Sequence, residues 1–257
     1  MYYSRIDVRA ALLNFARSTN SIGIRETAFY NSKVKGLQRY FENNGSKRPV
    51  NIDNTDIDYL VSTGASAFYF SYWRYASLDF DNPIGRDLVW IVRPKQGGIV
   101  ASKKVTKHVV DVLKGLGIEP WIKYDGDRGF DIIIPLETIP YEAWMGDLSI
   151  LDEIQRQLTD FIASQIDERT SPSNRMSESS LEITTDAGIC LLSELRVRRG
   201  LLLAPMSLNP KTDLISVPIS ADEIENFTVL NATKTVSYTH LRAHETRHDL
   251  VCRLLLE

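Results

Sequence analysis

The spacing of hydrophobic residues along the chain predicts which segments are helices and which are strands. Apolar residues recur at intervals of three or four, the spacing of an amphipathic helix, in three segments: residues 7 to 17, 101 to 116 and 148 to 166. Gly117 directly follows the second segment and is suited to the left-handed conformation that ends a helix. Ser220 is expected to start one further short helix, ADEIENF.

Shorter apolar runs, rich in β-branched and aromatic residues, predict strands. They are ASAFYF at residues 65 to 70, DLVWIV at residues 87 to 92, and two strands around a turn in PWIKYDGDRGFDIIIPLE at residues 120 to 137. Gly126 and Gly129 allow that turn, because glycine adopts backbone conformations that other residues avoid. Two polar segments are expected to be irregular: a connecting loop at residues 41 to 56 and an exposed, mobile excursion at residues 166 to 180.

Strands that alternate with helices, together with hairpins, are typical of a mixed α/β or α+β domain whose mixed sheet is flanked by helices. The pattern predicts an N-terminal helical segment at residues 1 to 54 that packs on the core, an α/β domain at residues 55 to 235, and a tail at residues 236 to 257. With 257 residues, of which 43% are hydrophobic and 25% charged, the chain has an ordinary soluble composition and can build a sizeable core.

Composition also limits the cellular setting and the partners. The chain begins without the apolar stretch of a signal peptide and has no apolar run near the roughly 20 residues that span a bilayer, so we expect a cytoplasmic protein without membrane contact. Its two cysteines, Cys190 and Cys252, are too few for a disulfide framework. Because the formal net charge is −3, any nucleic-acid contact must come from a local basic strip.

Several sequence blocks occur in an informative order. They are YYSRIDV with the helix that ends in FAR, RETAFYN, the W-R pair at Trp73, KYDGDRGFDIIIP, and APMSLNPKTDLISVPIS. Their order and spacing, over about residues 2 to 230, resemble the small catalytic subunit of archaeal and eukaryotic-type DNA primases, particularly a diverged group of archaeal primase-like proteins. The resemblance implies a primase small-subunit-like fold, DNA or RNA as a partner, and a primase large subunit or another replication protein as a further partner.

The resemblance also implies a mechanism in which carboxylates hold two divalent cations, which activate a hydroxyl group and stabilise the leaving pyrophosphate. In the family an Asp-x-Asp pair ends a central strand, so that both side chains share one face and meet the same metals. Placed by its spacing to the glycine turn, this pair falls on Trp90, Ile91 and Val92, which offer no oxygen ligand. The third metal position falls near Leu192, where Glu194 is the nearest acid.

Other family positions have changed as well. Asp125 stands where a phosphate-binding serine is expected, and Asp131 where a histidine is expected. Asn209 replaces a second expected histidine, whereas Ser207 and Lys211 remain. A carboxylate in the glycine turn would repel a triphosphate unless a cation lay between them. The leading hypothesis is therefore a diverged primase-like protein without two-metal catalysis and with no metal or cofactor, which binds nucleic acid or acts as an accessory in DNA replication or repair.

Two alternatives stay open. An active primase or polymerase, a nucleotidyltransferase, would use Asp79, Asp81 and Asp131 with magnesium or manganese, because Asp79 and Asp81 also have the i, i+2 spacing. Turn residues are the plainer interpretation of that pair, since Asn82 and Pro83 follow it. The weaker alternative is a protein-assembly module whose arginines face a protein partner.

The candidate residues for binding a nucleotide or nucleic acid are mostly basic. If ELRVR is a strand, Glu194, Arg196 and Arg198 share one face. Such a strip suits phosphates as well as it suits ion pairs on a solvated face. The full candidate set comprises Lys123, Arg128, Arg196, Arg198, Arg199, Ser207, Asn209 and Lys211.

The tail contains HETRH, His244 to His248, which fits the H-E-x-x-H pattern of zinc proteases. Together with His240, the histidines would span about 12 Å along a helix, too far for all three to reach one ion. From about Val236 the sequence resembles translated sequencing-adapter read-through, which implies a non-native extension. We therefore expect no metal site in the tail.

Overall fold

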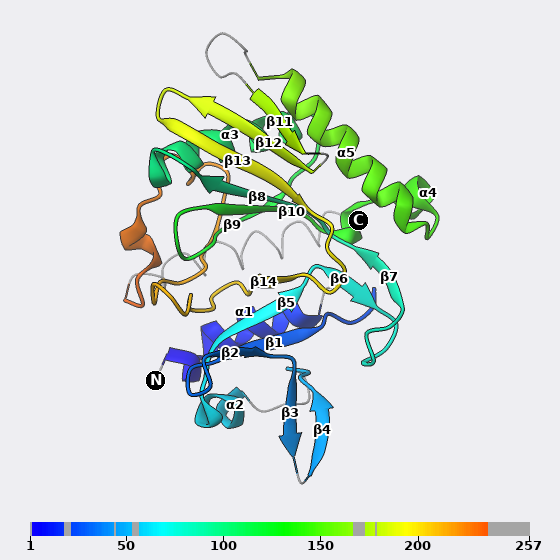
Figure 1. The fold of residues 1–257 in the computed structure, drawn as a ribbon, viewed down its shortest axis with the longest axis vertical. Helices are drawn as coiled ribbons and strands as arrows, with labels where there is room; N and C mark the ends of the chain where they lie inside the picture. Colours follow the sequence, from blue (N-terminus) through cyan, green and yellow to red (C-terminus); the bar gives the residue numbers. More distant parts are fainter. Residues whose placement is uncertain are drawn as a thin grey trace, which may run out of the picture.

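Two antiparallel β-sheets lie one above the other in the computed structural model (Figure 1). The structure describes residues 2–17, 22–43, 45–52, 57–166, 173–177 and 179–235. Within these ranges, every strand pairing in the two sheets is antiparallel. Helices pack against the sheets, so the fold is α+β, in agreement with the class predicted from the pattern.

The larger sheet has seven strands and carries the central strand predicted from the sequence. In spatial order its strands are β11 (Ser173–Ser177), β12 (Ser180–Thr185), β13 (Gly188–Leu195), β8 (Leu88–Pro94), β10 (Phe130–Ile134), β9 (Trp121–Tyr124) and β15 (Pro218–Ile219). Two long helices, α3 (Gly98–Gly115) and α5 (Leu148–Ser164), cover one of its faces. The indole N–H of Trp90 on β8 donates to Thr159 Oγ1 on α5 at 2.8 Å, which ties this helix to the sheet.

The smaller sheet has four strands: β14 (Leu201–Leu203), β5 (Ala65–Ser71), β1 (Thr27–Asn31) and β2 (Gly36–Gln38). Helix α1 (Ile6–Arg17) packs on it, with the rings of Phe15 and Phe70 5.7 Å apart. A hairpin of β3 (Tyr40–Asn43) and β4 (Ser46–Pro49) projects from this end of the molecule beside α2 (Ile57–Thr63) (Figure 1). The shorter elements are η1 (Tyr2–Ser4), β6 (Trp73–Tyr75), β7 (Pro83–Arg86), η2 (Leu136–Thr138), α4 (Tyr141–Trp144) and η3 (Val229–Ala232).

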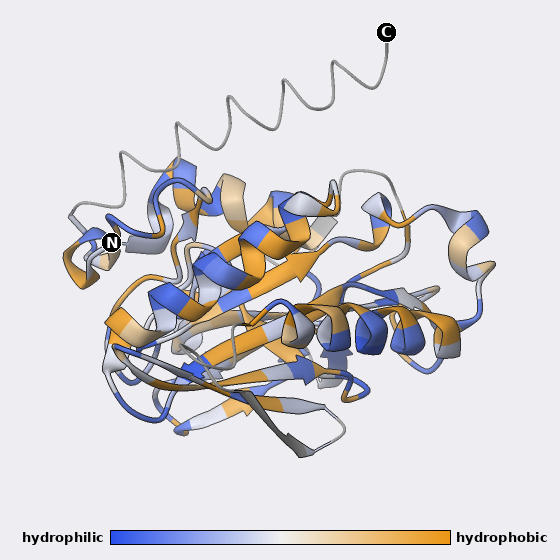
Figure 2. Ribbon diagram, turned by 90° about the horizontal axis from the view of Figure 1, so that it is seen from above, coloured by the Kyte–Doolittle hydropathy of each residue, from blue (hydrophilic) through white to orange (hydrophobic). Residues whose placement is uncertain are grey.

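The central strand β8 alternates its side chains between the two faces of the larger sheet. Trp90 is fully buried beneath the helices, whereas Val89 packs in a cluster with Leu202 of the smaller sheet. Ile91 and Arg93 share the side of Val89, so they lie on the face that is turned toward the smaller sheet. Figure 2 shows strands made mostly of hydrophobic residues and helices that alternate hydrophobic and hydrophilic positions.

Most of the predicted elements are confirmed. The three long helices correspond to α1, α3 and α5, and the predicted strands correspond to β5, β8, β9 and β10. Gly117 has a φ of 78°, the left-handed conformation expected after α3. No helix in the described ranges is long and apolar enough to cross a membrane.

The predictions for polar segments were less successful. The expected loop at residues 41 to 56 contains most of the hairpin β3–β4, and the expected excursion at residues 166 to 180 contains β11. ADEIENF forms turns rather than a helix. Residues 1 to 54 are not only helical, because β1 and β2 belong to the same sheet as β5 and β14. The predicted tail, with HETRH, lies outside the described residues.

Candidate functional site

The turn between β9 and β10 lies against the end of β8 and is built by one aspartate and two glycines. Asp125 Oδ1 accepts the backbone N–H groups of Asp127 and Gly129 at 2.8 and 2.9 Å. Gly126 has a φ of 77°, which favours glycine. A Cβ atom on Gly129 would lie 2.2 Å from the carbonyl oxygen of Val92, so only glycine allows the turn to approach β8 this closely.

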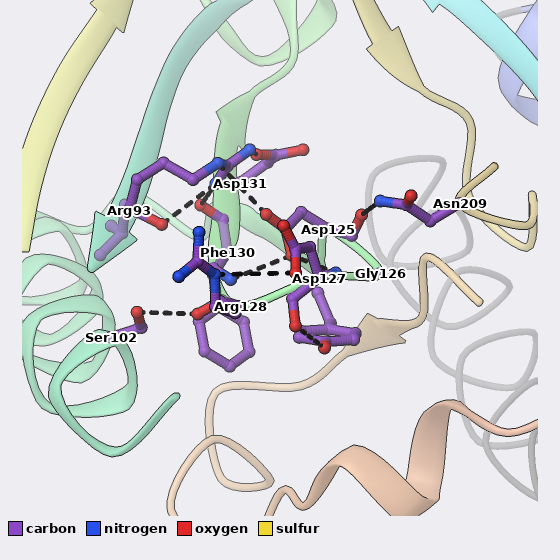
Figure 3. A network of polar contacts seen from close by, with 12 residues as sticks. Arg93, Ser102, Asp125, Gly126, Asp127, Arg128, Phe130, Asp131 and Asn209 are labelled. Carbon is purple, nitrogen blue, oxygen red and sulfur yellow. Dashed lines mark hydrogen bonds and ion pairs between the residues drawn. The ribbon is translucent and has the colours of Figure 1, made fainter. Parts of the chain in front are cut away.

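Asp131, at the start of β10, lies between two cations. Register places it beside Lys123 of β9 and Ile91 of β8. Lys123 Nζ forms an ion pair with one carboxylate oxygen of Asp131, and Arg93 Nη2 pairs with the other at 2.6 Å. Arg93 Nε also lies 3.2 Å from Asp125 Oδ2, so the guanidinium joins Asp131 to the turn (Figure 3). Asp131 and Lys123 are 1% and 3% exposed.

Further donors of these two cations also bind groups of the protein. Arg93 Nη1 donates to the carbonyl oxygens of Val92 and Phe130 at 3.0 and 2.9 Å. Lys123 Nζ donates to Ser216 Oγ at 3.2 Å, and this hydroxyl donates to the backbone. The polar groups are thus arranged as a buried hydrogen-bonded network, which is the condition under which charges are tolerated in a protein interior.

The electrostatics keep this cluster ionised. Burial alone would raise the pKa of Asp131, but Lys123 and Arg93 outweigh it, and the pKa is held below its ordinary value. Burial alone would lower the pKa of Arg93, but Asp131 and Asp125 outweigh it, and the pKa is raised. The cluster therefore contains a fixed guanidinium and a fixed carboxylate at neutral pH.

The face that carries Asp131 does not fit a two-metal centre. On this face β8 presents Ile91 and Arg93, and β13 presents Ser193, which pairs with Ile91. Ile91 has no atom that binds metal, Arg93 is a cation and Ser193 has a hydroxyl. None of them supplies the carboxylate ligand that magnesium would need here. In the described part of the chain, no group of three histidine, cysteine, aspartate or glutamate side chains is placed to hold a metal ion.

The metal-ligand positions predicted from the spacing along the chain are one residue away from those on this face. Trp90 and Val92 were expected opposite the glycine turn, and Leu192 at the third metal position, but all three are buried in the core with the helices. Glu194 pairs with Trp90 and so lies on the helix face, where its carboxylate binds Arg196. Spacing along the chain could not settle the face, because a shift of one residue turns every side chain of a strand over.

The three aspartates that an active polymerase would use, Asp79, Asp81 and Asp131, do not lie close together. Asp79 and Asp81 lie exposed in the loop between β6 and β7. Asp79 Oδ1 accepts a hydrogen bond from Ser77 Oγ at 2.7 Å and one from the backbone N–H of Asp81 at 3.2 Å, the pattern of a turn. This loop and the β9–β10 turn lie at opposite ends of β8 (Figure 1), so Asp131, beside the turn, is remote from Asp79 and Asp81.

Three of the predicted binding residues, Ser207, Asn209 and Lys211, belong to the segment that follows β14. Ser207 is fully buried, and its Oγ accepts the backbone N–H of Phe68 at 2.7 Å. Asn209 Nδ2 donates to the carbonyl oxygen of Asp125 at 3.3 Å and holds this segment against the turn (Figure 3). Lys211 and Arg128 flank the carboxylate of Asp127 and are 72% and 64% exposed.

The predicted arginine strip is a loop rather than a strand face. Strand β13 ends at Leu195, and the indole of Trp73 and the hydroxyl of Tyr72 both donate to the carbonyl oxygen of Val197, at 2.8 and 2.7 Å. The arginines of this loop point to separate partners: Arg196 to Glu194, Arg198 to the backbone of Asp81, and Arg199 to Glu26. Among them only Arg198 is exposed; Arg196 and Arg199 are half-buried.

Exposed basic residues that the sequence analysis missed lie in two places: Lys33 and Lys35 in the turn between β1 and β2, and Lys47 and Arg48 on β4 of the hairpin. We call these four residues together the hairpin surface. Within the described residues, none of the four forms an ion pair with a carboxylate; Lys33 donates to a backbone carbonyl, and Lys47 lies 5.1 Å from the ring centre of Tyr40. Residues 31 to 49 hold five basic residues and one acidic residue, a local excess that the overall charge of −3 conceals.

Comparison with known proteins identifies the fold. No protein-family model and no curated protein matches the chain. Among solved structures, the chain is similar to the polymerase domain of ligase D from Mycobacterium tuberculosis in complex with DNA, with 15% sequence identity and a TM-score of 0.54. The match covers 88% of this chain and 80% of that one. The chain has a primase-like polymerase fold.

Proposed function

We propose that this chain is a diverged relative of the primase small subunit that binds nucleic acid as an accessory in DNA replication or repair, without two-metal nucleotidyl transfer. The observation that carries the proposal is the replacement of the expected carboxylates by Ile91, Arg93 and Ser193 on a primase-like polymerase fold. The similar polymerase domain was solved in complex with DNA, and this analogy of fold supports nucleic acid as the ligand.

The hairpin surface supports the binding part of this proposal. Lysine and arginine side chains that are not neutralised by carboxylates are free to contact phosphates, and such contacts supply most of non-specific affinity. Two tyrosines of this region, Tyr40 and Tyr59, are 36% and 43% exposed and are suited to stacking on bases. Arg128, Lys211 and Arg198 add exposed cations elsewhere.

The binding experiment uses fluorescence anisotropy with labelled single-stranded and duplex DNA over a range of salt concentrations. Because few cations carry the contact within an acidic chain, we expect weak binding, and because the contact is electrostatic, we expect it to be lost as the salt concentration rises. The double variant K47E/R48E should weaken it about tenfold or more and lower the slope of log K against log salt by about 2. The control K104E/K107E makes the same charge change on α3, where both lysines already form ion pairs, and should bind like the wild type.

The outcomes separate the parts of the proposal. No binding by the wild type at low salt would contradict the nucleic-acid function. Equal loss in K47E/R48E and in the control would show that overall charge, rather than the hairpin surface, governs binding.

A primer-extension assay with magnesium or manganese tests the absence of catalysis. We expect no extension of a primer and no synthesis of one from nucleotides, since Asp131 has no carboxylate neighbour on β8. Extension that is abolished by Asp79→Ala would overturn this and establish an active polymerase that uses the β6–β7 loop.

A further inference from the structure

The β9–β10 turn concentrates negative charge. Asp125, Asp127 and Asp131 lie within seven residues, and the first and last of them point toward the end of β8. Like charges so close together are unfavourable unless a cation lies between them. In this fold the cation comes from within the chain, on the neighbouring strand.

We propose that the guanidinium of Arg93 takes the place of a divalent cation between Asp125 and Asp131. The cluster is thus a metal site that a side chain of the protein itself occupies. Arg93 Nε lies 3.2 Å from Asp125 Oδ2, and Arg93 Nη2 lies 2.6 Å from Asp131 Oδ1. One guanidinium thus joins two carboxylates from different parts of the turn, which is the bridging role of a shared metal ion. The inference concerns this cluster and holds whether or not the chain binds nucleic acid.

Each carboxylate oxygen of Asp125 and Asp131 already has a partner within the protein. Asp131 Oδ2 is taken by Lys123, and Asp125 Oδ1 by two backbone N–H groups. The other oxygen of each carboxylate is taken by Arg93 (Figure 3). A divalent cation would have to displace the guanidinium, which is also fixed to the carbonyl oxygens of Val92 and Phe130. Its permanent charge and forked geometry make arginine well suited to such a bridge.

The charges of the four groups balance. Two cations, Arg93 and Lys123, face two carboxylates, Asp125 and Asp131. Asp127 has its own cations, Arg128 and Lys211, so the cluster has no excess of negative charge that would attract a further ion. The depressed pKa of Asp131 and the raised pKa of Arg93 agree with this pairing. A neutral, saturated cluster is a structural feature of the sheet rather than a site that loads and releases metal.

The proposal predicts that replacing Arg93 and its neighbour Ile91 with metal ligands opens a metal site. Ile91 and Arg93 have the i, i+2 spacing on the face of Asp131, so aspartates at both positions would place two further carboxylates beside it. Oxygen ligands of this kind suit manganese and magnesium. The variant I91D/R93D should therefore acquire a site that the wild type lacks.

Manganese binding is measured by titration calorimetry, with folding of each protein checked by circular dichroism. We expect I91D/R93D to bind manganese at least about tenfold more tightly than the wild type. The variant I91N/R93N removes the guanidinium without adding carboxylates and should bind more tightly than the wild type but more weakly than I91D/R93D. If neither variant binds manganese more tightly than the wild type, Arg93 does not block a metal site.

The wild type supplies a second test that does not depend on how well the variants fold. Its melting temperature should be the same in EDTA and in excess manganese, because an ion that does not bind cannot stabilise the folded state. Saturable manganese binding by the wild type that disappears in Asp131→Asn would overturn the proposal. Failure of the chain to bind DNA would leave all of these results unchanged, so the two proposals can fail separately.

Discussion

Replacing Asp131 with asparagine removes the charge that holds the cluster together while keeping the size of the side chain. Asp131 is 1% exposed and lies between Lys123, which is 3% exposed, and Arg93, whose side chain is 35% exposed. In the variant the ammonium of Lys123 has only neutral partners, the hydroxyl of Ser216 and the amide oxygen at position 131. The substitution therefore leaves an uncompensated charge in the interior.

The expected cost follows from this geometry. Removing one partner of a buried ion pair costs about 3–5 kcal/mol. Solvent screens the share that comes from Arg93, so we expect the lower end, about 3 kcal/mol. For a domain of this size, that loss lowers the melting temperature by about 6–12 °C.

Urea unfolding at neutral pH, followed by circular dichroism, measures this loss. The matched control is Asp111→Asn, the same change in an ion pair with Lys107 on the exposed side of α3, and it should leave the unfolding midpoint nearly unchanged. A loss below about 1 kcal/mol in Asp131→Asn would refute the reasoning, because it would mean that the cluster does not stabilise the sheet.

The same variant should change the pH dependence of stability. The pKa of Asp131 is lower in the folded state than in the unfolded chain, so its stabilisation is present above the unfolded value of about 3.9 and is lost as the pH falls through the folded value. Asp87, whose pKa is lowered by Arg25 and Arg74 against the effect of burial, contributes in the same direction. Acidification should therefore destabilise the wild type more than it destabilises Asp131→Asn.

Two further substitutions test the structural roles assigned to the site. Gly129→Ala should destabilise the chain strongly, because its Cβ atom would lie 2.2 Å from a backbone oxygen. Gly115→Ala at the end of α3 should be neutral or stabilising, because nothing lies within 4 Å of its Cβ position. Urea unfolding compares the two variants, and equal effects would contradict the close packing of the turn. Ser207→Ala should cost about 1–3 kcal/mol by leaving the backbone N–H of Phe68 without an acceptor. The DNA affinity of Ser207→Ala should stay that of the wild type, and a selective loss of binding without loss of stability would show that Ser207 contacts the ligand instead.

Periodicity along the chain was sufficient to predict the elements that carry the core. Helices α3 and α5 and strands β8 and β10 have long apolar patterns, and tertiary contacts reinforce what the local pattern already favours. The hairpin β3–β4 was missed because its strands are polar and half-exposed. An Asn-Gly pair at residues 44 and 45 was the available signal, since this pair favours a tight hairpin turn.

The candidate site was only partly predictable, because long-range register determines it. The sequence singled out the glycine turn with Asp125 and Asp131, which the structure places in one cluster, but not Arg93 as the partner of both. That assignment requires Asp131 to pair with Ile91 across two strands. Likewise, Glu26 and Arg199 are 173 residues apart in the sequence, and no local pattern connects them.

The central claim, that this primase-like fold binds nucleic acid without a divalent metal, is tested most directly by one comparison. DNA binding is measured by anisotropy in EDTA and in magnesium at matched ionic strength. The account predicts the same dissociation constant in both, because the positions that would hold metal carry Ile91, Arg93 and Ser193. Binding that appears only with magnesium, and that is lost in Asp131→Asn, would contradict it.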